Sequence, residues 1–318
     1  MKRFGGITVI SDTVLNLNKL HRFYGDFEAL SGISLEIKKG QIFGYLGPNG
    51  SGKTTTIKLL LGLIKPSSGS LTVLGEDPYV DDARAMDTRR NIGSMLEFDG
   101  LYEQLTGLQN LVYWAELYGL EDQNAITQAK EMIDSMKLSE WAGTKVAKYS
   151  FGMRKRLALA RAMVCDPDIL ILDEPTVGVD PESRFLIRNM IKDLAAQGKT
   201  IFFSSHDLEE VQKVCSHIAI LKKGKLIFKG TLGDVINKLG RFKLFIRLKS
   251  SKNAYLMANK LHEVGYDVKK EGPLISFYPE DDLDMSLFTK EEVLDTWKIS
   301  SSLEDVYLKA VADEEVET

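Results

Sequence analysis

A glycine-rich run that ends in a lysine and a threonine is the part of this sequence best suited to bind phosphate. It consists of Gly47-Pro48-Asn49-Gly50-Ser51-Gly52-Lys53-Thr54 and fits the spacing GxxxxGK[ST] between a predicted strand and a predicted helix. Glycines let successive backbone N–H groups converge on phosphate oxygens, and the following helix adds partial positive charge at its N-terminus. In such a loop Lys53 can reach the β- and γ-phosphates, and the Thr54 hydroxyl can ligate Mg²⁺. We therefore expect residues 47–54 and the adjacent Thr55 to hold a nucleoside triphosphate with Mg²⁺.

Two adjacent carboxylates, Asp173 and Glu174, follow the fully apolar run Ile169–Leu172. Such a run predicts a parallel strand buried on both faces, and ligands of parallel sheets bind at the carboxyl ends of the strands. We expect Asp173 to hold Mg²⁺ through water and Glu174 to polarise a water molecule aimed at the γ-phosphate. Because side chains alternate along a strand, the two carboxylates should point in different directions, which suits two separate roles.

Hydrophobic periodicity predicts the elements that must position these residues. Strands are predicted at Val14–Asn18, Ala29–Ile37, Gln41–Leu46, Leu71–Leu74, Asn91–Leu96, Ile169–Leu172, Thr200–Ser204, Ile218–Leu221 and Leu226–Phe228. Helices are predicted at Lys53–Leu63, Glu182–Ala196, Asp207–Val214 and Leu232–Leu239, and residues 98–165 are predicted to be a helical insertion. Strands that alternate with helices indicate an α/β core with a largely parallel sheet.

Beyond Gly240, the predicted domain boundary, the pattern becomes that of a small α+β domain. Phe242–Leu248 and Leu274–Tyr278 alternate like strands, and Asn253–Val264 has helical spacing. Residues 241–318 hold 16 acidic and 11 basic side chains, so this part is more acidic than the rest. We therefore expect a nucleotide-binding domain at residues 1–240 and an accessory domain without a catalytic motif at residues 241–318.

The composition excludes several classes of protein. Hydrophobic residues make up 44% of the 318 and charged residues 27%, which is typical of a globular chain. The 41 basic residues do not exceed the 45 acidic ones, so we expect no nucleic-acid partner. The two cysteines, Cys165 and Cys215, argue against a disulfide scaffold or zinc ribbon and fit a reducing compartment.

The sequence predicts no helix that crosses a membrane. Its longest uncharged stretches, Gly40–Gly52 and Gln104–Ala115, have thirteen and twelve residues, whereas a spanning helix needs about 20 apolar residues. A short apolar run, Phe4–Ile10, follows two basic residues, but no small-residue cleavage site comes after it. We therefore expect an ordinary N-terminal extension and not a signal peptide.

These residues resemble those of the ATP-binding-cassette (ABC) ATPases, and the resemblance covers Val14 to Gly240. The segment Tyr149-Ser150-Phe151-Gly152-Met153 lies shortly before the apolar strand, where the family has its LSGGQ signature, and it keeps the Ser and the second Gly. The resemblance implies that Ser150 and Gly152, at the start of a helix, face the γ-phosphate held by a second subunit. Val177-Gly178-Val179-Asp180 resembles the D-loop, which implies that Asp180 lies at the interface between two subunits.

Two further residues take their expected roles from the same resemblance. Ser204-Ser205-His206-Asp207 resembles the segment that carries the switch histidine. His206 would then hydrogen-bond the γ-phosphate and hold Glu174 and the attacking water in line. Tyr24 resembles the aromatic residue that stacks on adenine, with Phe23 or Phe27 as alternatives for that role.

The sequence departs from the family pattern at Glu97, which stands where the family usually has a glutamine. A glutamate still offers an oxygen to Mg²⁺ or water, but it adds negative charge near Asp173 and cannot donate an N–H group. A glutamate here resembles the bacitracin- and lantibiotic-type exporters; the alternative is a neutral replacement without meaning for specificity. Near the end, Ile299–Leu308 resembles the ending of ATPase subunits of ABC-2-type exporters, although the pattern alone predicts only an N-capped amphipathic helix.

The resemblance implies a P-loop NTPase core of the ABC type, with an antiparallel β subdomain and an inserted helical subdomain. It implies an ATP-binding and ATP-hydrolysing subunit of a multi-subunit transporter, an exporter, that powers a separate transmembrane permease. Two copies, expected to be identical, would close head to tail around ATP and Mg²⁺ on the cytoplasmic face of the membrane. One alternative is a soluble ABC ATPase that acts on ribosomes or nucleic acid; another is a nucleotide-binding regulator without turnover, against which Glu174 and His206 argue.

Overall fold

The computed structural model describes residues 12–80, 83–239, 242–279 and 293–300, together with 303, 304 and 307. The chain divides into two compact units, residues 1–231 and residues 232–318. The predicted boundary, Gly240, and the N-terminal run Phe4–Ile10 lie outside the described residues. The division places helix α8, Leu232–Leu239, in the second unit rather than at the end of the first.

An antiparallel sheet of three strands begins the first unit. Its order is β2-β1-β4, formed by β1 (Thr13–Tyr24), β2 (Phe27–Lys38) and β4 (Ser68–Val73). The tight turn between β1 and β2 contains Gly25 at a φ of 58°, a left-handed conformation that favours glycine. This turn places Tyr24 opposite Phe27 at the end of the hairpin. The expected antiparallel β subdomain is therefore present.

The second sheet of this unit has six strands in the order β5-β6-β7-β3-β8-β9. These strands are β3 (Ile42–Leu46), β5 (Ile92–Met95), β6 (Ile169–Asp173), β7 (Thr200–Ser205), β8 (His217–Lys222) and β9 (Lys225–Thr231). The first five in the order pair in parallel, and β9 pairs antiparallel with β8. Every residue of β3, β6 and β7 is buried, which explains why these strands are continuous runs of mainly apolar residues and do not alternate. The carboxyl ends of β5, β6, β7 and β3 meet along one edge.

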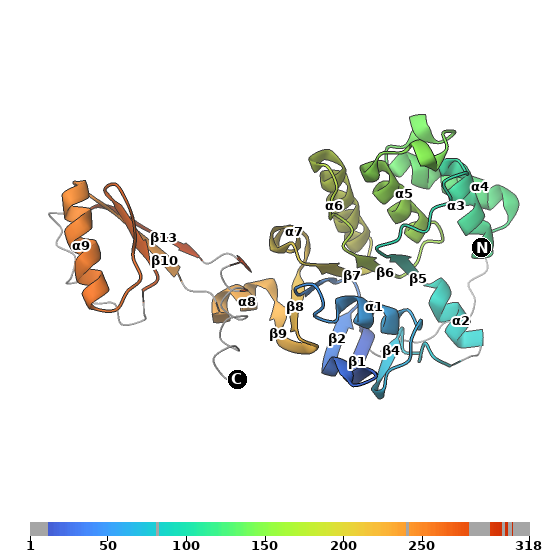
Figure 1. The fold of residues 1–318 in the computed structure, drawn as a ribbon. Coiled ribbons are helices and arrows are strands. Elements are labelled where there is room, and N and C mark those ends of the chain that lie inside the picture. Colours follow the sequence, from blue (N-terminus) through green and yellow to red (C-terminus); the bar gives the residue numbers. More distant parts are fainter. Residues whose placement is uncertain are drawn as a thin grey trace. The chain divides into compact units, whose positions relative to one another are not determined.

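Helices cover this sheet and also form a separate group beside β5 (Figure 1). The helices of the unit are α1 (Lys53–Leu60), α2 (Ala83–Arg90), α3 (Gly107–Leu117), α4 (Asp122–Ser135), α5 (Phe151–Met163), α6 (Pro181–Ala196) and α7 (Leu208–Val214). Helices α3, α4 and α5 form the separate group, which is the predicted helical insertion. Thr106 starts α3 with a capping box to Gln109, so the sequence fixes where that helix begins.

A buried aromatic contact fastens the start of α1 to the parallel sheet. Tyr45 on β3 and Phe202 on β7 have ring centroids 5.1 Å apart, and both side chains are fully buried. The hydroxyl groups of Tyr45 and Thr56, the latter on α1, are hydrogen-bonded at 3.1 Å. This contact holds α1 at the edge of the sheet where the glycine-rich run lies.

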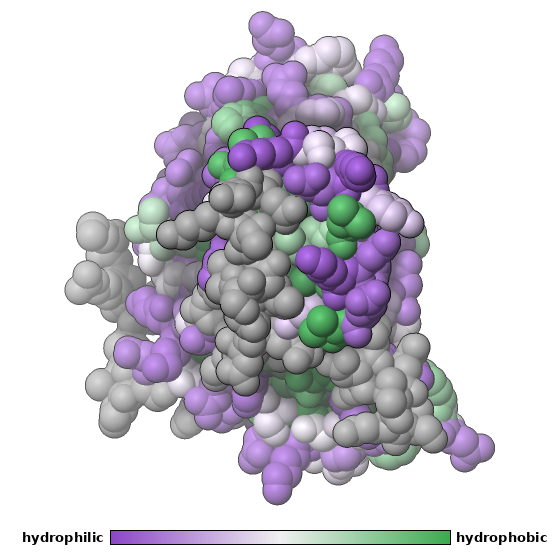
Figure 2. All heavy atoms as spheres, turned by 90° about the vertical axis from the view of Figure 1, so that its left-hand side faces the viewer, coloured by the Kyte–Doolittle hydropathy of each residue, from purple (hydrophilic) through white to green (hydrophobic). Residues whose placement is uncertain are grey.

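The second unit has its own sheet and its own core. The sheet order is β11-β12-β10-β13, from β10 (Phe242–Leu248), β11 (Lys269–Glu271), β12 (Leu274–Phe277) and β13 (Val293–Ser300). Helix α9 (Ser251–Glu263) is capped by Ser250 and packs its buried face, including Met257 and Leu261, into a cluster with Ile246, Ile275 and Phe277. On the face that Figure 2 shows, the residues coloured by hydropathy include apolar side chains scattered among hydrophilic ones. In neither unit does a described helix have the length and apolar character needed to span a membrane.

Candidate functional site

The glycine-rich run connects β3 to α1, as the sequence predicts, and two of its glycines, Gly47 and Gly52, are sterically required. A Cβ on Gly47 would lie 2.4 Å from the carbonyl oxygen of Leu221. Gly52 has a φ of 111°, and a Cβ there would lie 2.8 Å from the carbonyl oxygen of Ala29. Gly52 is also the N-cap of α1 and has no side chain to cap it. The first turn of α1 therefore keeps backbone N–H groups for a ligand.

Lys53 lies folded across the loop that precedes it. Its Nζ donates hydrogen bonds to the carbonyl oxygens of Gly47 at 2.7 Å and Pro48 at 3.2 Å. The same Nζ is 3.7 Å from Oε1 of Glu174, and the side chain is only 7% exposed. Burial lowers the pKa of Lys53, and the negative charges of Glu174 and Asp173 oppose this change. The ammonium group thus lies between the phosphate-binding loop and the carboxylate pair.

Asp173 and Glu174 have different surroundings, as their alternation along a strand predicts. Asp173 ends β6, is buried, and accepts a hydrogen bond from the Ser204 hydroxyl on β7. Glu174 has a φ of 50°, a conformation that is costly for a residue with a side chain. Its backbone N–H donates to the carbonyl and hydroxyl oxygens of Ser204, both at 3.2 Å, which holds this turn in place.

His206 lies against Glu174 at the end of β7. Its Nδ1 is 3.0 Å from Oε1 of Glu174, and its backbone N–H donates to Oε2 at 3.4 Å. His206 is about half exposed and Glu174 is 21% exposed, so both reach the solvent side of the sheet edge. A carboxylate between an ammonium group and an imidazole can orient and polarise a water molecule.

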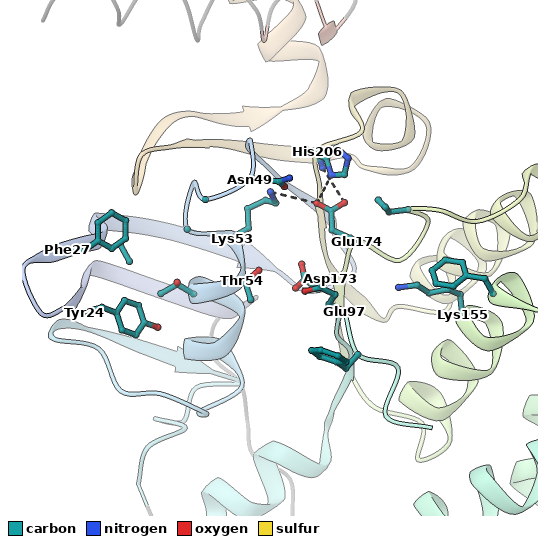
Figure 3. Close-up of a pocket in the computed structure, with 17 residues that line it drawn as sticks. Tyr24, Phe27, Asn49, Lys53, Thr54, Glu97, Lys155, Asp173, Glu174 and His206 are labelled. Atoms are coloured by element: carbon teal, nitrogen blue, oxygen red, sulfur yellow. Dashed lines mark hydrogen bonds and ion pairs between the residues drawn. The ribbon is translucent and has the colours of Figure 1, made fainter. Parts of the chain in front are cut away.

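These groups line one pocket of about 730 Å³ (Figure 3), a volume that suits a nucleotide-sized ligand. Its lining residues are Tyr24, Phe27, Ala29, Asn49, Gly50, Gly52, Lys53, Thr54, Thr55, Glu97, Phe98, Phe151, Lys155, Asp173, Glu174, Val177 and His206. Glu97, which follows β5, lies in the same pocket wall and is exposed. The sequence therefore predicted most of the polar residues that the fold brings together here.

The aromatic side of the pocket is formed by the β1–β2 hairpin. Tyr24 is 45% exposed and Phe27 is 64% exposed, so neither is a core residue. The Arg22 guanidinium lies 4.7 Å from the centre of the Tyr24 ring. Phe23, the other candidate from the sequence, is not among the lining residues. Of the three candidates from the sequence, Tyr24 and Phe27 therefore line the pocket, to which Phe98 and Phe151 add two further aromatic rings.

The residues present fit a nucleotide with Mg²⁺. Ser51 of the same loop does not line the pocket, and its buried hydroxyl oxygen has no hydrogen-bond partner among the described residues. Thr54 and Asp173 both line the pocket and offer oxygen atoms. In the described part of the chain, no three His, Cys, Asp or Glu side chains cluster as a metal cage. Mg²⁺ is usually held by few protein groups together with phosphate oxygens and water, and Thr54 and Asp173 offer such groups.

Ser150, Gly152 and Asp180 lie together but outside this pocket. Ser150 caps α5 by accepting a hydrogen bond from the Met153 N–H at 3.2 Å. Asp180 caps α6 by accepting from the Ser183 N–H at 2.9 Å, and the hydrogen bonds from Ser183 lower the pKa of Asp180. A Cβ on Gly152 would lie 2.4 Å from Oδ2 of Asp180, so only glycine permits this approach. The three residues do not line the pocket of their own chain.

Phe151 and Lys155 are pocket residues that the sequence analysis did not select. Both come from α5, and Lys155 is only 6% exposed. The sequence did contain a signal for Lys155, its helical spacing from buried residues. It lies three residues after Gly152 and four before Leu159, both of which are buried on the same helix. A lysine in a buried stripe predicts either a charge partner or a ligand.

Comparisons with known proteins agree with this fold and site. Residues 30–177 match the ABC transporter family. The chain is 39% identical over 224 residues to the Nod factor export ATP-binding protein I of Cupriavidus pinatubonensis. This match covers 70% of this chain and 68% of that protein. It is 34% identical over 306 residues to the bacitracin transport ATP-binding protein BcrA of Bacillus licheniformis, covering 94% and 97%. A solved dimer of the ATP-binding cassette MJ0796, in a post-hydrolysis state with ADP and Pi, has a TM-score of 0.64 and 27% identity over 69% of this chain and 98% of that one.

The phosphate-binding loop, the carboxylate pair and the histidine, set at one edge of a parallel sheet, define an ATPase of the P-loop class. Together with the matches they show that the chain belongs to the ABC transporter family. It is an ATP-binding subunit of that family, and it hydrolyses ATP with Mg²⁺. The alternative of a soluble ABC ATPase that acts on ribosomes or nucleic acid is not favoured.

Proposed function

We propose that this chain powers an exporter whose transmembrane permease is a separate polypeptide. The observation that carries the proposal is the match to the bacitracin transport ATP-binding protein, which extends over 94% of this chain and so includes its second unit. Relatives named for Nod factor export and for linearmycin resistance support the same class. The chain would lie on the cytoplasmic face of the membrane as a peripheral subunit.

In this proposal ATP lies along the pocket, with its adenine at the β1–β2 hairpin and its phosphates at the edge of the parallel sheet. Tyr24 stacks on the adenine, with Phe27 as the alternative, since both line the pocket. Gly47, Pro48, Asn49, Gly50, Ser51 and Gly52 surround the phosphates, with Thr55 beside them. Lys53 exchanges its hydrogen bonds to the Gly47 and Pro48 carbonyls for phosphate oxygens. Thr54, Asp173 and Glu97 supply oxygen atoms on the side of the Mg²⁺ ion, which neutralises charge on the phosphates.

Hydrolysis in this proposal depends on Glu174 and His206. Glu174 accepts a proton from a water molecule as the water oxygen forms a bond to the γ-phosphorus. The bond from that phosphorus to the β–γ bridging oxygen breaks, and the bridging oxygen stays with ADP. Inorganic phosphate leaves with the oxygen of the water molecule. His206, 3.0 Å from Glu174, holds the carboxylate in place and donates to the γ-phosphate.

The complete site in this proposal needs a second copy of the chain. Ser150 and Gly152, at the N-terminus of α5, lie outside the pocket of their own chain and are free to face the γ-phosphate of the partner copy. Asp180 would lie at the same interface. A dimeric relative of known structure supports this arrangement. Closure of two identical copies around ATP, and their reopening after hydrolysis, would then drive the permease.

Fractionation of the native host tests the assignment to a transporter. We expect the tagged chain to stay with washed membranes at physiological salt and to be released by alkaline carbonate without detergent. We expect the same membranes to hydrolyse ATP, and the E174Q variant to remain membrane-bound while that activity is lost. Co-sedimentation with ribosomes or nucleic acid, with no chain on the membranes, would contradict the proposal.

A further inference from the structure

Glu210, on α7, is a buried carboxylate that faces two arginines of α6. Helices α6 and α7 lie side by side in the first unit (Figure 1). Only 2% of Glu210 is exposed, and its Oε1 is 3.5 Å from Nη1 of Arg188 and 3.8 Å from Nη1 of Arg184. Its Oε2 is buried and has no hydrogen-bond partner among the described residues. A buried carboxylate needs opposite charge nearby, so the two arginines fasten α7 to α6.

Arg184 also contacts the residue that caps α7. The same Nη1 is 3.8 Å from Oδ2 of Asp207, while Oδ1 of Asp207 accepts a hydrogen bond from the Glu210 N–H at 3.1 Å. Arg184 is itself held at the start of α6, where its backbone N–H donates to the carbonyl oxygen of Asp180 at 2.9 Å. One guanidinium group therefore joins the first turn of α6 to the first turn of α7.

The burial of Glu210 distinguishes this cluster from an ordinary surface ion pair. Arg184 and Asp207 are each about one-third exposed, and a pair of that kind contributes little by itself. The contact of Arg184 with Glu210 is different, because a buried charge that loses a partner destabilises the fold strongly. Glu210 thus anchors the Arg184 guanidinium at the place where it meets Asp207.

His206 directly precedes Asp207, so its position depends on this cluster. The Asp207 N–H donates to the Ser205 hydroxyl at 2.9 Å, which fixes the backbone around His206. His206 contacts Glu174 through both its ring and its backbone N–H, so a shift of the backbone changes both contacts together. Arg184 and Asp207 do not line the pocket themselves. They can affect hydrolysis only through a pocket residue, and His206 is the one to which they are joined.

We propose that Arg184 is a positioning residue for His206. It holds Asp207, and with it the start of α7, against α6, and the buried Glu210 fixes its guanidinium group. The imidazole then stays in contact with Glu174 during hydrolysis, where a displacement of a reacting group by about 1 Å can cost up to about 10²-fold in rate. The inference rests on the role of His206 in the proposed function.

Arg188 provides a matched comparison for Arg184. In the part of the chain that the structure describes, Arg188 has an ion pair with Glu210 but none with Asp207. Loss of either arginine leaves Glu210 with one cation, whereas only the loss of Arg184 removes a contact of Asp207. A difference between R184M and R188M therefore measures the hold on Asp207 apart from the stability of the buried carboxylate.

A set of variants in the full-length chain tests the proposal. It comprises R184M, R184K, R188M, D207N, H206A and R184M/H206A, with K192M as the control for loss of a cation at an exposed position of α6. Single-turnover phosphate release gives the hydrolysis rate even for slow variants. The KM for ATP, binding of a fluorescent ATP analogue and the melting temperature are measured alongside. D207N keeps a good capping residue but removes the charge that faces Arg184, so it replaces R184M should that variant melt below the assay temperature.

We expect R184M and D207N to lower the hydrolysis rate about tenfold while ATP binding stays within about twofold of wild type. R184K should keep at least about half of the rate, R188M should lose less than R184M, and K192M should match the wild type. In the H206A background R184M should change the rate less than about twofold, because the residue it positions is gone.

A wild-type hydrolysis rate in R184M or D207N would overturn the proposal. Equal losses in R184M and R188M would do so too, since they would show an effect of the buried carboxylate alone. A tenfold loss from R184M that persists in the H206A background would show that Arg184 does not act through His206. An inactive wild-type chain in the same assay would instead contradict the proposed function.

Discussion

The hydroxyl of Ser204 links Asp173 to Glu174, because it donates to Oδ1 of Asp173 and accepts from the backbone N–H of Glu174. Ser204 is fully buried on β7, the strand that pairs with β6. One side chain thus fixes the orientation of the buried carboxylate and also the strained turn at the next residue. The geometry of the carboxylate pair therefore depends on the neighbouring strand as well as on its own.

Replacement of Ser204 by alanine tests this link. We expect S204A to leave the Asp173 carboxylate without its partner and to destabilise the chain by about 1–3 kcal/mol. The ATPase rate should fall as well, since Glu174 loses one of the contacts that hold its turn. Chemical denaturation and steady-state ATPase measurements check both effects. A variant with wild-type stability and rate would show that the hydrogen bonds of Ser204 do not position the pair.

The variants Lys53→Ala and Ser150→Arg should separate ATP binding by a single chain from ATP hydrolysis by a dimer of two chains. K53A removes a cation from the pocket itself, so we expect it to weaken binding of ATP to the isolated chain. S150R changes a residue outside that pocket, so we expect binding to persist while dimer-dependent turnover is blocked. Titration with a fluorescent ATP analogue and ATPase assays over a range of protein concentrations measure the difference. Equal loss of binding in both variants would contradict a site made by two subunits.

Tyr24 and Phe27, the two aromatic residues of the hairpin that line the pocket, should differ from Phe23 in their effect on ATP binding. We expect Y24A to raise the KM for ATP about two- to tenfold, because a stacking contact is lost. F23A is the matched control, since Phe23 is similarly exposed but does not line the pocket. KM values for ATP and GTP in both variants and in F27A measure base contacts. A larger effect of F27A than of Y24A would assign the stacking role to Phe27.

Truncation tests the division of the chain into two units. The structure divides at Thr231, whereas the sequence predicts the boundary at Gly240, so both endpoints are informative. Because all pocket residues precede Thr231, we expect both truncated chains to fold and to bind ATP with wild-type affinity. We expect the second unit to stabilise the dimer or to regulate its closure, so the truncated chains should differ in ATPase rate or dimer stability. A folded truncated chain that cannot bind ATP would contradict the division.

Much of the first unit can be predicted from its sequence, because buried parallel strands are short apolar runs. Strands β3, β6 and β7 lie within a residue or two of their predicted bounds. Helix α2 was not predicted, since Ala83–Arg90 contains few apolar residues and no apolar stripe. Strand β13 was not predicted either: Ile299 and Ser300 end it by pairing with β10, although their segment resembles the start of a capped helix. The secondary structure of such segments is determined by their pairing with distant strands and not by the local sequence pattern.

The polar residues of the pocket could be predicted for a related reason. Lys53, Asp173 and His206 each follow a recognisable strand, and the carboxyl ends of parallel strands meet at one edge. Lys155 could not be placed in this way, because it reaches the pocket from an inserted helical segment. Its position depends on how α5 packs against the segment after β5, through Arg154 and Asp99. A contact of that kind between distant parts of the chain has no local sequence signal.

In the proposed mechanism Glu174 activates water in a pocket closed by a second copy, and the variant Glu174→Gln removes that carboxylate alone. The measurement is the rate of phosphate release by E174Q, with light scattering in the presence of MgATP to follow the dimer. E131Q, at an exposed position on α4, is the matched control and should behave as the wild type. We expect E174Q to bind MgATP, to hydrolyse it about 10²–10⁴-fold more slowly, and to accumulate as an ATP-dependent dimer. Phosphate release at the wild-type rate would show that Glu174 does not activate water, and slow hydrolysis by a variant that remains monomeric with MgATP bound would rule out closure by a second copy.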